Sequence, residues 1–83
     1  MAKLKFEERC LALGIGKNIK KLREKKGWTQ DELSERANIH ISYIGQIERG
    51  LWYPSLKIIF RIADALEVKI AELLKGIDVK KNK

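Results

Sequence analysis

The sequence is poor in the residues that form disulfides, metal sites and catalytic centres. It has one cysteine, Cys10, and one histidine, His40. A single cysteine forms no intrachain disulfide, so a reducing, cytoplasmic compartment fits the chain best. One cysteine and one histidine do not make a metal-ligand set, and no nucleophile–base arrangement is recognisable. We therefore expect no metal, no cofactor and no enzymatic activity.

Long apolar runs are also absent, and the longest spans only a few residues. This pattern predicts neither a membrane span nor a signal peptide. The 83 residues, of which 45% are hydrophobic, suffice for one domain with a small core.

Acidic residues are scarce in the middle of the chain. Between Arg36 and Asp64 the only acid is Glu48, whereas Arg49, Lys57 and Arg61 lie in the same span. The formal net charge of the whole chain is +7. This balance favours a polyanionic partner, either a nucleic acid or an acidic membrane surface.

The stretch from Thr29 to Gly50 predicts two short helices joined by a tight turn. Thr29 is a good N-cap, and Glu32 three residues later completes a capping box. The turn falls at Asn38, a residue type that tolerates the left-handed backbone conformation. This layout is typical of a helix-turn-helix, here residues 30–49, that places its second helix in a DNA groove.

The second helix, about residues 41–49, has two different sides on a helical wheel. Ile44 and Ile47 form the side expected to pack, and the opposite side carries no acid. The candidates for contact with base edges are Ile41, Ser42 and Gln46. The candidates for contact with phosphates are Thr29, Gln30, Tyr43, Arg49 and Lys57.

Glu48 lies beside the packed side of this helix, where a carboxylate without a partner is costly. The best partner is Arg23, one turn after Ile19 on the preceding helix. We predict an Arg23–Glu48 salt bridge. The alternative is that Glu48 points to water.

The first part of the chain predicts a helix over about residues 16–26, ended by Gly27. Residues 1–14 are interpreted as an N-terminal extension with a short helix that ends at Gly14. The alternative is that they continue the next helix upstream. The extension would cap the core or contribute a dimer contact.

The last part of the chain predicts two more helices. Ser55 caps a helix over about residues 56–66, whose inward residues are expected to be Leu56, Ile59, Phe60, Ala63 and Leu66. A short helix follows over about residues 70–75. The apolar residues expected to form a dimer interface are Ile70, Leu73, Leu74 and Ile77. Trp52 and Tyr53 either touch the DNA backbone or a partner, or pack on the preceding helix. Residues 77–83 form a basic tail.

Several of these features combine into one resemblance. Thr29-Gln30, Ile44, Ile47, Glu48-Arg49-Gly50 and Pro54-Ser55-Leu56 together resemble the lambda-repressor-like Cro/cI (XRE) family. The resemblance implies an all-α domain of five helices over residues 15–76, with the second and third helices forming the helix-turn-helix. It also implies a homodimer on a palindromic operator, with Gln30 on phosphate, Ile41, Ser42 and Gln46 facing bases, and Arg23 paired with Glu48.

The chain departs from the family at the start of the second helix of the motif. Ile41 stands where many relatives place a polar residue, and an apolar side chain there either contacts a thymine methyl group or merely fills space. The expected function is that of a sequence-specific transcriptional regulator, a nucleoid-associated homodimer on double-stranded DNA, similar to phage-type repressors and to restriction–modification controller proteins. The alternative is an antitoxin-like protein that masks a toxin partner and autoregulates its operon.

Overall fold

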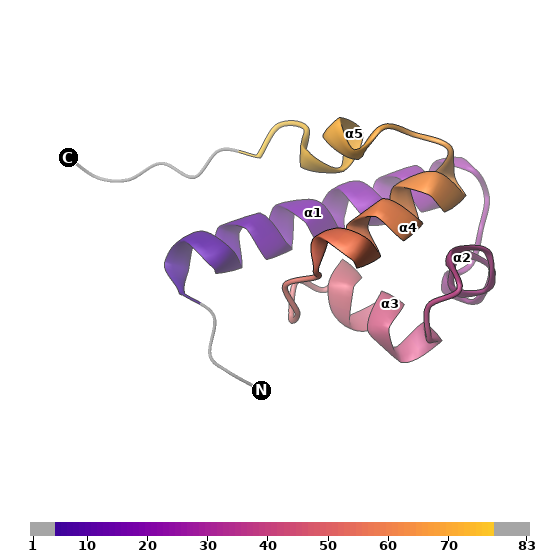
Figure 1. Cartoon of the computed structure of the whole chain (residues 1–83), viewed down its shortest axis with the longest axis horizontal. Coiled ribbons are helices and arrows are strands. Elements are labelled where there is room, and N and C mark those ends of the chain that lie inside the picture. The colour runs from indigo at the N-terminus through magenta and orange to yellow at the C-terminus, as the bar shows by residue number, and fades with distance from the viewer. Residues whose placement is uncertain (1–4, 78–83) are drawn as a thin grey trace.

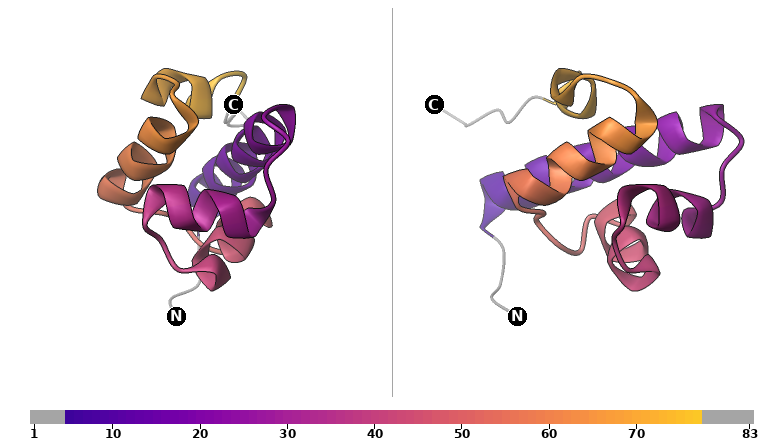
Figure 2. Two further views of the ribbon diagram at one scale, coloured as in Figure 1. Left: turned by 90° about the vertical axis from the view of Figure 1, so that its right-hand side faces the viewer. Right: turned by 45° about the vertical axis from the view of Figure 1, so that its right-hand side comes forward.

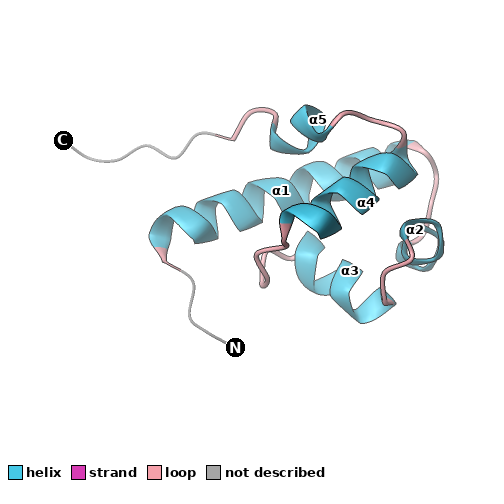
Figure 3. Ribbon diagram, in the orientation of Figure 1, coloured by secondary structure: helices cyan, strands magenta, loops and turns pink. Residues whose placement is uncertain are grey.

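Residues 5–77 are described by the computed structural model, and every regular element within them is a helix (Figure 3). The prediction of an all-α chain with five helices is confirmed. The basic tail predicted for residues 77–83 lies outside the described residues from position 78 onward. The helices are α1 (Phe6–Lys25), α2 (Gln30–Ala37), α3 (Ile41–Glu48), α4 (Leu56–Leu66) and α5 (Ile70–Leu74).

Helix α1 is the longest element, and the other helices are arranged around it (Figure 1). Helices α2 and α3 lie on one side of α1, and α5 lies on the other, as Figure 1 and the right-hand view of Figure 2 show. Helix α4 packs against α1, α2 and α5. The helix-turn-helix therefore occupies one end of the molecule, away from α5.

The N-terminal extension is not a separate helix. Helix α1 continues without a break through Gly14 and Gly16, so the short helix predicted to end at Gly14 is wrong and the alternative is correct. The two glycines are needed for packing. A Cβ atom on Gly16 would overlap the carbonyl oxygen of Ile47, and one on Gly14 would lie 2.6 Å from the Ile77 side chain. Both positions therefore allow α1 to lie close to its neighbours.

The core is small and draws on all five helices. The helical spacing of apolar residues in the sequence follows from this arrangement, because each helix directs one row of apolar side chains into the same core. The largest fully buried side chains are Ile15, Ile19, Leu33, Ile44, Ile47, Ile62, Leu66 and Leu73.

The inward face of α4 differs from the prediction. Leu56 and Phe60 were expected inside, but they are 71% and 58% exposed, whereas Ile62 is fully buried. The buried residues Ile59, Ile62 and Leu66 follow the i, i+3, i+7 spacing of a single stripe. Leu56 and Phe60 lie beside that stripe, so α4 has an exposed apolar surface next to its buried one.

Helix α5 is joined to α1 by hydrogen bonds from one side chain. The Nδ2 atom of Asn18 donates to the carbonyl oxygens of Leu73, at 2.8 Å, and Lys75, at 3.0 Å. Leu73 is fully buried in the core of its own chain, so its assignment to a dimer interface is wrong. Ile70 and Ile77 are half-buried against the same core, which leaves Leu74, 43% exposed, as the open member of that group.

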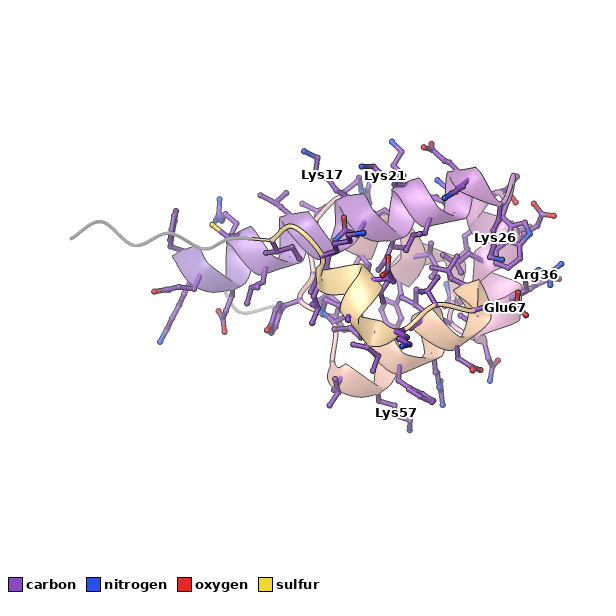
Figure 4. All side chains as sticks on the ribbon, turned by 90° about the horizontal axis from the view of Figure 1, so that it is seen from above. Lys17, Lys21, Lys26, Arg36, Lys57 and Glu67 are labelled. Atoms are coloured by element: carbon purple, nitrogen blue, oxygen red, sulfur yellow. The ribbon has the colours of Figure 1, made fainter. Side chains whose placement is uncertain are left out.

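A cluster of charges around Trp28 closes the end of α1. The Lys26 ammonium and the Arg36 guanidinium both lie over the Trp28 ring, 5.2 and 4.4 Å from its centroid. Lys26 also lies 3.5 Å from the Glu67 carboxylate. Figure 4 shows Lys26, Arg36 and Glu67 together at this end of the molecule. Trp28 is half-buried and packs against the core, as its aromatic character suggests.

Candidate nucleic-acid interface

The helix-turn-helix begins and turns as its sequence predicts. The Thr29 hydroxyl oxygen accepts from the Glu32 backbone N–H at 3.1 Å, and the Glu32 carboxylate accepts from the Thr29 backbone N–H at 2.8 Å. This reciprocal pair is the predicted capping box. Asn38 ends α2 at φ 57° and ψ 49°, which is the left-handed conformation. Both local devices fix the angle between α2 and α3.

Helix α3 is held by one side and open on the other. Ile44 and Ile47 are fully buried, as predicted. The opposite side of α3 and the start of α2 form a shallow depression at the surface, which we call the α3 flank. Its lining residues are Gln30, Ile41, Ser42, Gly45, Gln46 and Arg49. The structure thus brings the three predicted base-contacting residues together with two of the predicted phosphate-contacting residues.

A buried ion pair anchors the end of α3 to α1. The Arg23 guanidinium donates to both carboxylate oxygens of Glu48, from Nε to Oε2 at 2.7 Å and from Nη2 to Oε1 at 3.0 Å. Arg23 Nη1 also donates to the carbonyl oxygen of Trp28 at 2.6 Å. The predicted salt bridge is therefore present, and Glu48 does not point to water. The hydrogen bond from Arg23 to Glu48 raises the pKa of Arg23, whereas desolvation by burial lowers it. The first effect is the larger, so the guanidinium stays charged.

Gln30 joins this ion pair to the α3 flank. Its Nε2 atom donates to Glu48 Oε1 at 3.0 Å, and its Oε1 lies near Gly45. One of the two amide hydrogens is thus committed to Glu48, and the second is available to a ligand. Thr29 differs, because its hydroxyl also lies 3.3 Å from the Glu32 carboxylate and its proton has a partner there.

His40 has a role that the sequence analysis missed. It is the N-cap of α3, and its Nδ1 atom accepts from the Ser42 backbone N–H at 3.1 Å. The same Nδ1 lies 2.9 Å from Ser42 Oγ. The available signal was the position of His40 directly before the helix. Histidine is not among the residues usually preferred at N-caps, so this signal is weak.

The loop between α3 and α4 packs on α3 through an aromatic stack. The rings of Tyr43 and Trp52 have centroids 4.8 Å apart and planes inclined by 17°. Trp52 is half-buried, so the packing alternative is correct for this residue. Tyr43 and Tyr53 are both exposed. The stack fixes the path of the loop that leads to Lys57.

Two of the predicted phosphate-contacting cations are exposed near this loop. Arg49 directly follows α3, and Lys57 lies in the first turn of α4. Figure 4 shows the Lys57 side chain extending away from the molecule, at the edge opposite Lys17 and Lys21. Lys57 faces the positive end of its own helix dipole, so an anion beside it would be favourable.

Other kinds of site are not found in the part of the chain that the structure describes. Over residues 5–77, no three histidine, cysteine, aspartate or glutamate side chains gather to hold a metal ion. None of the described helices has both the length and the apolar character needed to cross a bilayer.

Known proteins share both the sequence pattern and the fold. The chain is 35% identical over 60 residues to the immunity repressor protein of Bacillus phage phi105, which covers 72% of this chain and 42% of the repressor. It is 37% identical over 65 residues to the transcriptional regulator SinR of Bacillus licheniformis, covering 77% of this chain and 59% of SinR. The chain thus spans about half the length of these two relatives.

A solved structure matches over nearly its whole length. The restriction–modification controller protein C.AhdI from Aeromonas hydrophila superimposes with a TM-score of 0.73 and 34% identity, covering 75% of this chain and 94% of the controller. Residues 19–73 match the family model HTH_3, described as helix-turn-helix. This matched range contains the capping box, the Asn38 turn and the whole of α3. The chain belongs to the HTH_3 (XRE) family of helix-turn-helix proteins.

Proposed function

We propose that the protein is a transcriptional regulator that binds duplex DNA as a homodimer at an operator with two-fold symmetry. The observation that carries this proposal is the α3 flank, where Ser42, Gln46 and Arg49 share an open surface. Ile44 and Ile47 hold the opposite side of α3 in the core. A hydroxyl, an amide and a guanidinium on a fixed helix are the groups that bind base edges and phosphates.

In this proposal α3 enters the major groove and divides its contacts by chemistry. Ser42 and Gln46 hydrogen-bond to base edges, and Ile41 makes an apolar contact with a thymine methyl group. The phosphate contacts surround the groove and set the orientation of the domain. They come from Gln30, Tyr43, Arg49 and Lys57, whereas the Thr29 hydroxyl proton already has the Glu32 carboxylate as its partner.

A second copy of the chain supplies the other half of the recognition. Helix α3 has eight residues, so it is about 12 Å long and contacts only a few base pairs. Two copies related by a two-fold axis would place their α3 helices in successive major grooves, about 34 Å apart. The apolar surface for this contact would be Leu56 and Phe60 on α4 together with Leu74 on α5, because these three side chains are exposed while α4 and α5 pack together.

The relatives favour regulation by DNA occupancy. By name they include a phage immunity repressor, a transcriptional regulator and a restriction–modification controller protein. The match covers 94% of the solved controller chain, so a domain of this size makes up nearly all of that chain. These relatives support the regulator over the antitoxin-like alternative.

The proposal is tested by selecting bound duplexes from a random pool at moderate salt. The expected result is an enriched motif with two inverted half-sites whose centres are about 10 base pairs, one helical turn, apart. Light scattering of the purified complex should give two chains per duplex. Enrichment of no sequence would overturn the regulator, and a single asymmetric site with one chain per duplex would overturn the homodimer.

A further inference from the structure

A side chain that does not itself line the α3 flank controls one of the groups on it. His40 precedes α3, and its Nδ1 atom contacts both the backbone N–H and the hydroxyl of Ser42, at 3.1 and 2.9 Å. Ser42 lines the α3 flank, whereas His40 does not. Any effect of His40 on base recognition at this position would therefore be exerted through Ser42.

The two contacts together determine where the protons are. A backbone N–H can only donate, so Nδ1 must present its lone pair to Ser42. In the tautomer that fits this contact, Nδ1 carries no hydrogen and the ring hydrogen is on Nε2. Because Nδ1 carries no hydrogen, the 2.9 Å contact must be a hydrogen bond from the Ser42 hydroxyl to Nδ1. The hydroxyl hydrogen of Ser42 therefore points towards His40 Nδ1.

This arrangement restricts what Ser42 can recognise. A free serine hydroxyl can donate or accept, and for that reason serine pairs with any base. With its hydroxyl hydrogen directed at His40 Nδ1, Ser42 offers only oxygen lone pairs to the α3 flank. In the major groove the matching donors are the amino groups of adenine N6 and cytosine N4, whereas guanine and thymine present acceptors there.

We propose that His40 is a specificity-determining residue that makes Ser42 an acceptor and so selects adenine or cytosine at the base it contacts. The inference rests on the proposed function, because it assigns a base preference to one position of the operator. It adds a residue outside the expected base-contacting set. It also states the effect of that residue, which is to make Ser42 an acceptor rather than a donor.

The wild-type protein is tested first, on the operator obtained by selection. The contacted position is the one whose base preference disappears in Ser42→Ala. We expect adenine or cytosine there. Replacing that base by an analogue without the exocyclic amino group should weaken binding about 5-fold, the size of one neutral hydrogen bond. If the base is adenine, a 7-deaza analogue, which lacks only the N7 acceptor, should bind as well as adenine.

The role of His40 is tested with His40→Gly. Glycine is well tolerated at an N-cap and costs α3 little stability relative to the preferred capping residues, so the variant should fold. Its Ser42 hydroxyl is free to donate as well as to accept, so it can turn to an acceptor atom when the amino group is missing. We therefore expect the penalty for losing the amino group to fall below about 2-fold. Guanine or thymine should then be accepted at that position. These changes should be absent when Ser42→Ala is also present.

A matched control removes a cap from another helix. Ser55 caps α4 through a hydrogen bond to the Ile58 backbone N–H, so Ser55→Gly loses a cap without touching α3. Its base preference should remain that of the wild type. A preference for guanine or thymine at the Ser42 position, or a His40→Gly variant that weakens all duplexes equally, overturns the inference and leaves the proposed function standing. So does a Ser42→Ala variant with unchanged preferences. A wild-type protein without any sequence preference overturns both.

Discussion

The Nε atom of Arg23 lies 2.7 Å from Oε2 of Glu48, and this ion pair joins the last turn of α1 to the last residue of α3. Both side chains are buried, so neither charge can turn to water when the other is removed. The orientation of α3 depends on this pair as well as on Ile44 and Ile47.

Removing one partner should be strongly destabilising. Glu48→Ala leaves the Arg23 guanidinium buried and unpaired, and we expect the free energy of unfolding to fall by about 3–5 kcal/mol. Urea denaturation followed by circular dichroism measures this loss. The control is Glu67→Gln, which removes the exposed Lys26–Glu67 pair and should cost less than about 1 kcal/mol. Equal losses in the two variants would show that the buried pair has no special importance.

Two glycines should respond to alanine with opposite signs. Gly16→Ala forces α1 away from the carbonyl oxygen of Ile47, so it should destabilise the protein by about 1–3 kcal/mol. Gly45→Ala, inside α3, places its Cβ 3.7 Å from Gln30 Oε1, an ordinary contact. It should stabilise by about 0.5–1 kcal/mol, because alanine favours the helix. Thermal unfolding of both variants compares them, and a stable Gly16→Ala would contradict the tight approach of α1 to α3.

Gln46→Ala tests direct recognition of bases. The amide lies on the α3 flank, and we expect its loss to weaken operator binding by roughly 1–3 kcal/mol while most non-specific binding remains. Titration of the operator and of a scrambled duplex at the same salt concentration measures the difference. An equal loss on both duplexes would place Gln46 outside the base-contacting set.

Lys57→Ala tests the phosphate contacts. Binding to all duplexes should weaken, and the slope of log K against log salt should decrease in magnitude by about 1. Lys21 is a suitable control because it lies at the opposite edge of the molecule in Figure 4. Lys21→Ala should leave the slope unchanged. A Lys57→Ala slope equal to that of the wild type would remove Lys57 from the phosphate-contacting residues.

Phe60→Asp tests the proposed dimer surface. The side chain is 58% exposed in the single chain, so the substitution should leave the monomer folded. In a two-fold contact each new carboxylate would lie against the apolar surface of the other copy. We therefore expect the dimer dissociation constant to rise roughly 100-fold. Analytical ultracentrifugation over a range of concentrations measures it. Phe60→Leu, which keeps the surface apolar, should change it little, and an unaffected Phe60→Asp dimer would place the interface elsewhere.

The features that could be predicted from the sequence are those with a local cause. The capping box of Thr29 and Glu32 and the left-handed turn at Asn38 depend on neighbouring residues, and both are present. The Arg23–Glu48 pair was found because a carboxylate beside a buried stripe requires a partner. The contacts of Ser42 and Gln46 with bases stay predictions, since the chain alone does not test them.

The features that were missed depend on packing between distant segments. Gly14 was interpreted as the end of a short helix and Gly16 as the start of the next one. The sequence does not reveal that Ile77 and the end of α3 lie against these two glycines. Leu73 was assigned to a surface since a five-residue helix shows too little periodicity to mark its buried position. Phe60 was predicted to be buried because the helical wheel of α4 does not show on which side the other helices pack.

Glu48 Oε1 accepts hydrogen bonds from Arg23 on α1 and from Gln30 on α2, so one carboxylate oxygen unites three helices. Substitutions at these three positions are consequently epistatic: the effect of changing Gln30 depends on which residues occupy the other two. Replacing Glu48 alone would leave the Arg23 charge without its partner and would also remove the acceptor of the Gln30 amide. As the chain stands, the packing of three helices and the position of Gln30 at the α3 flank both depend on this one oxygen.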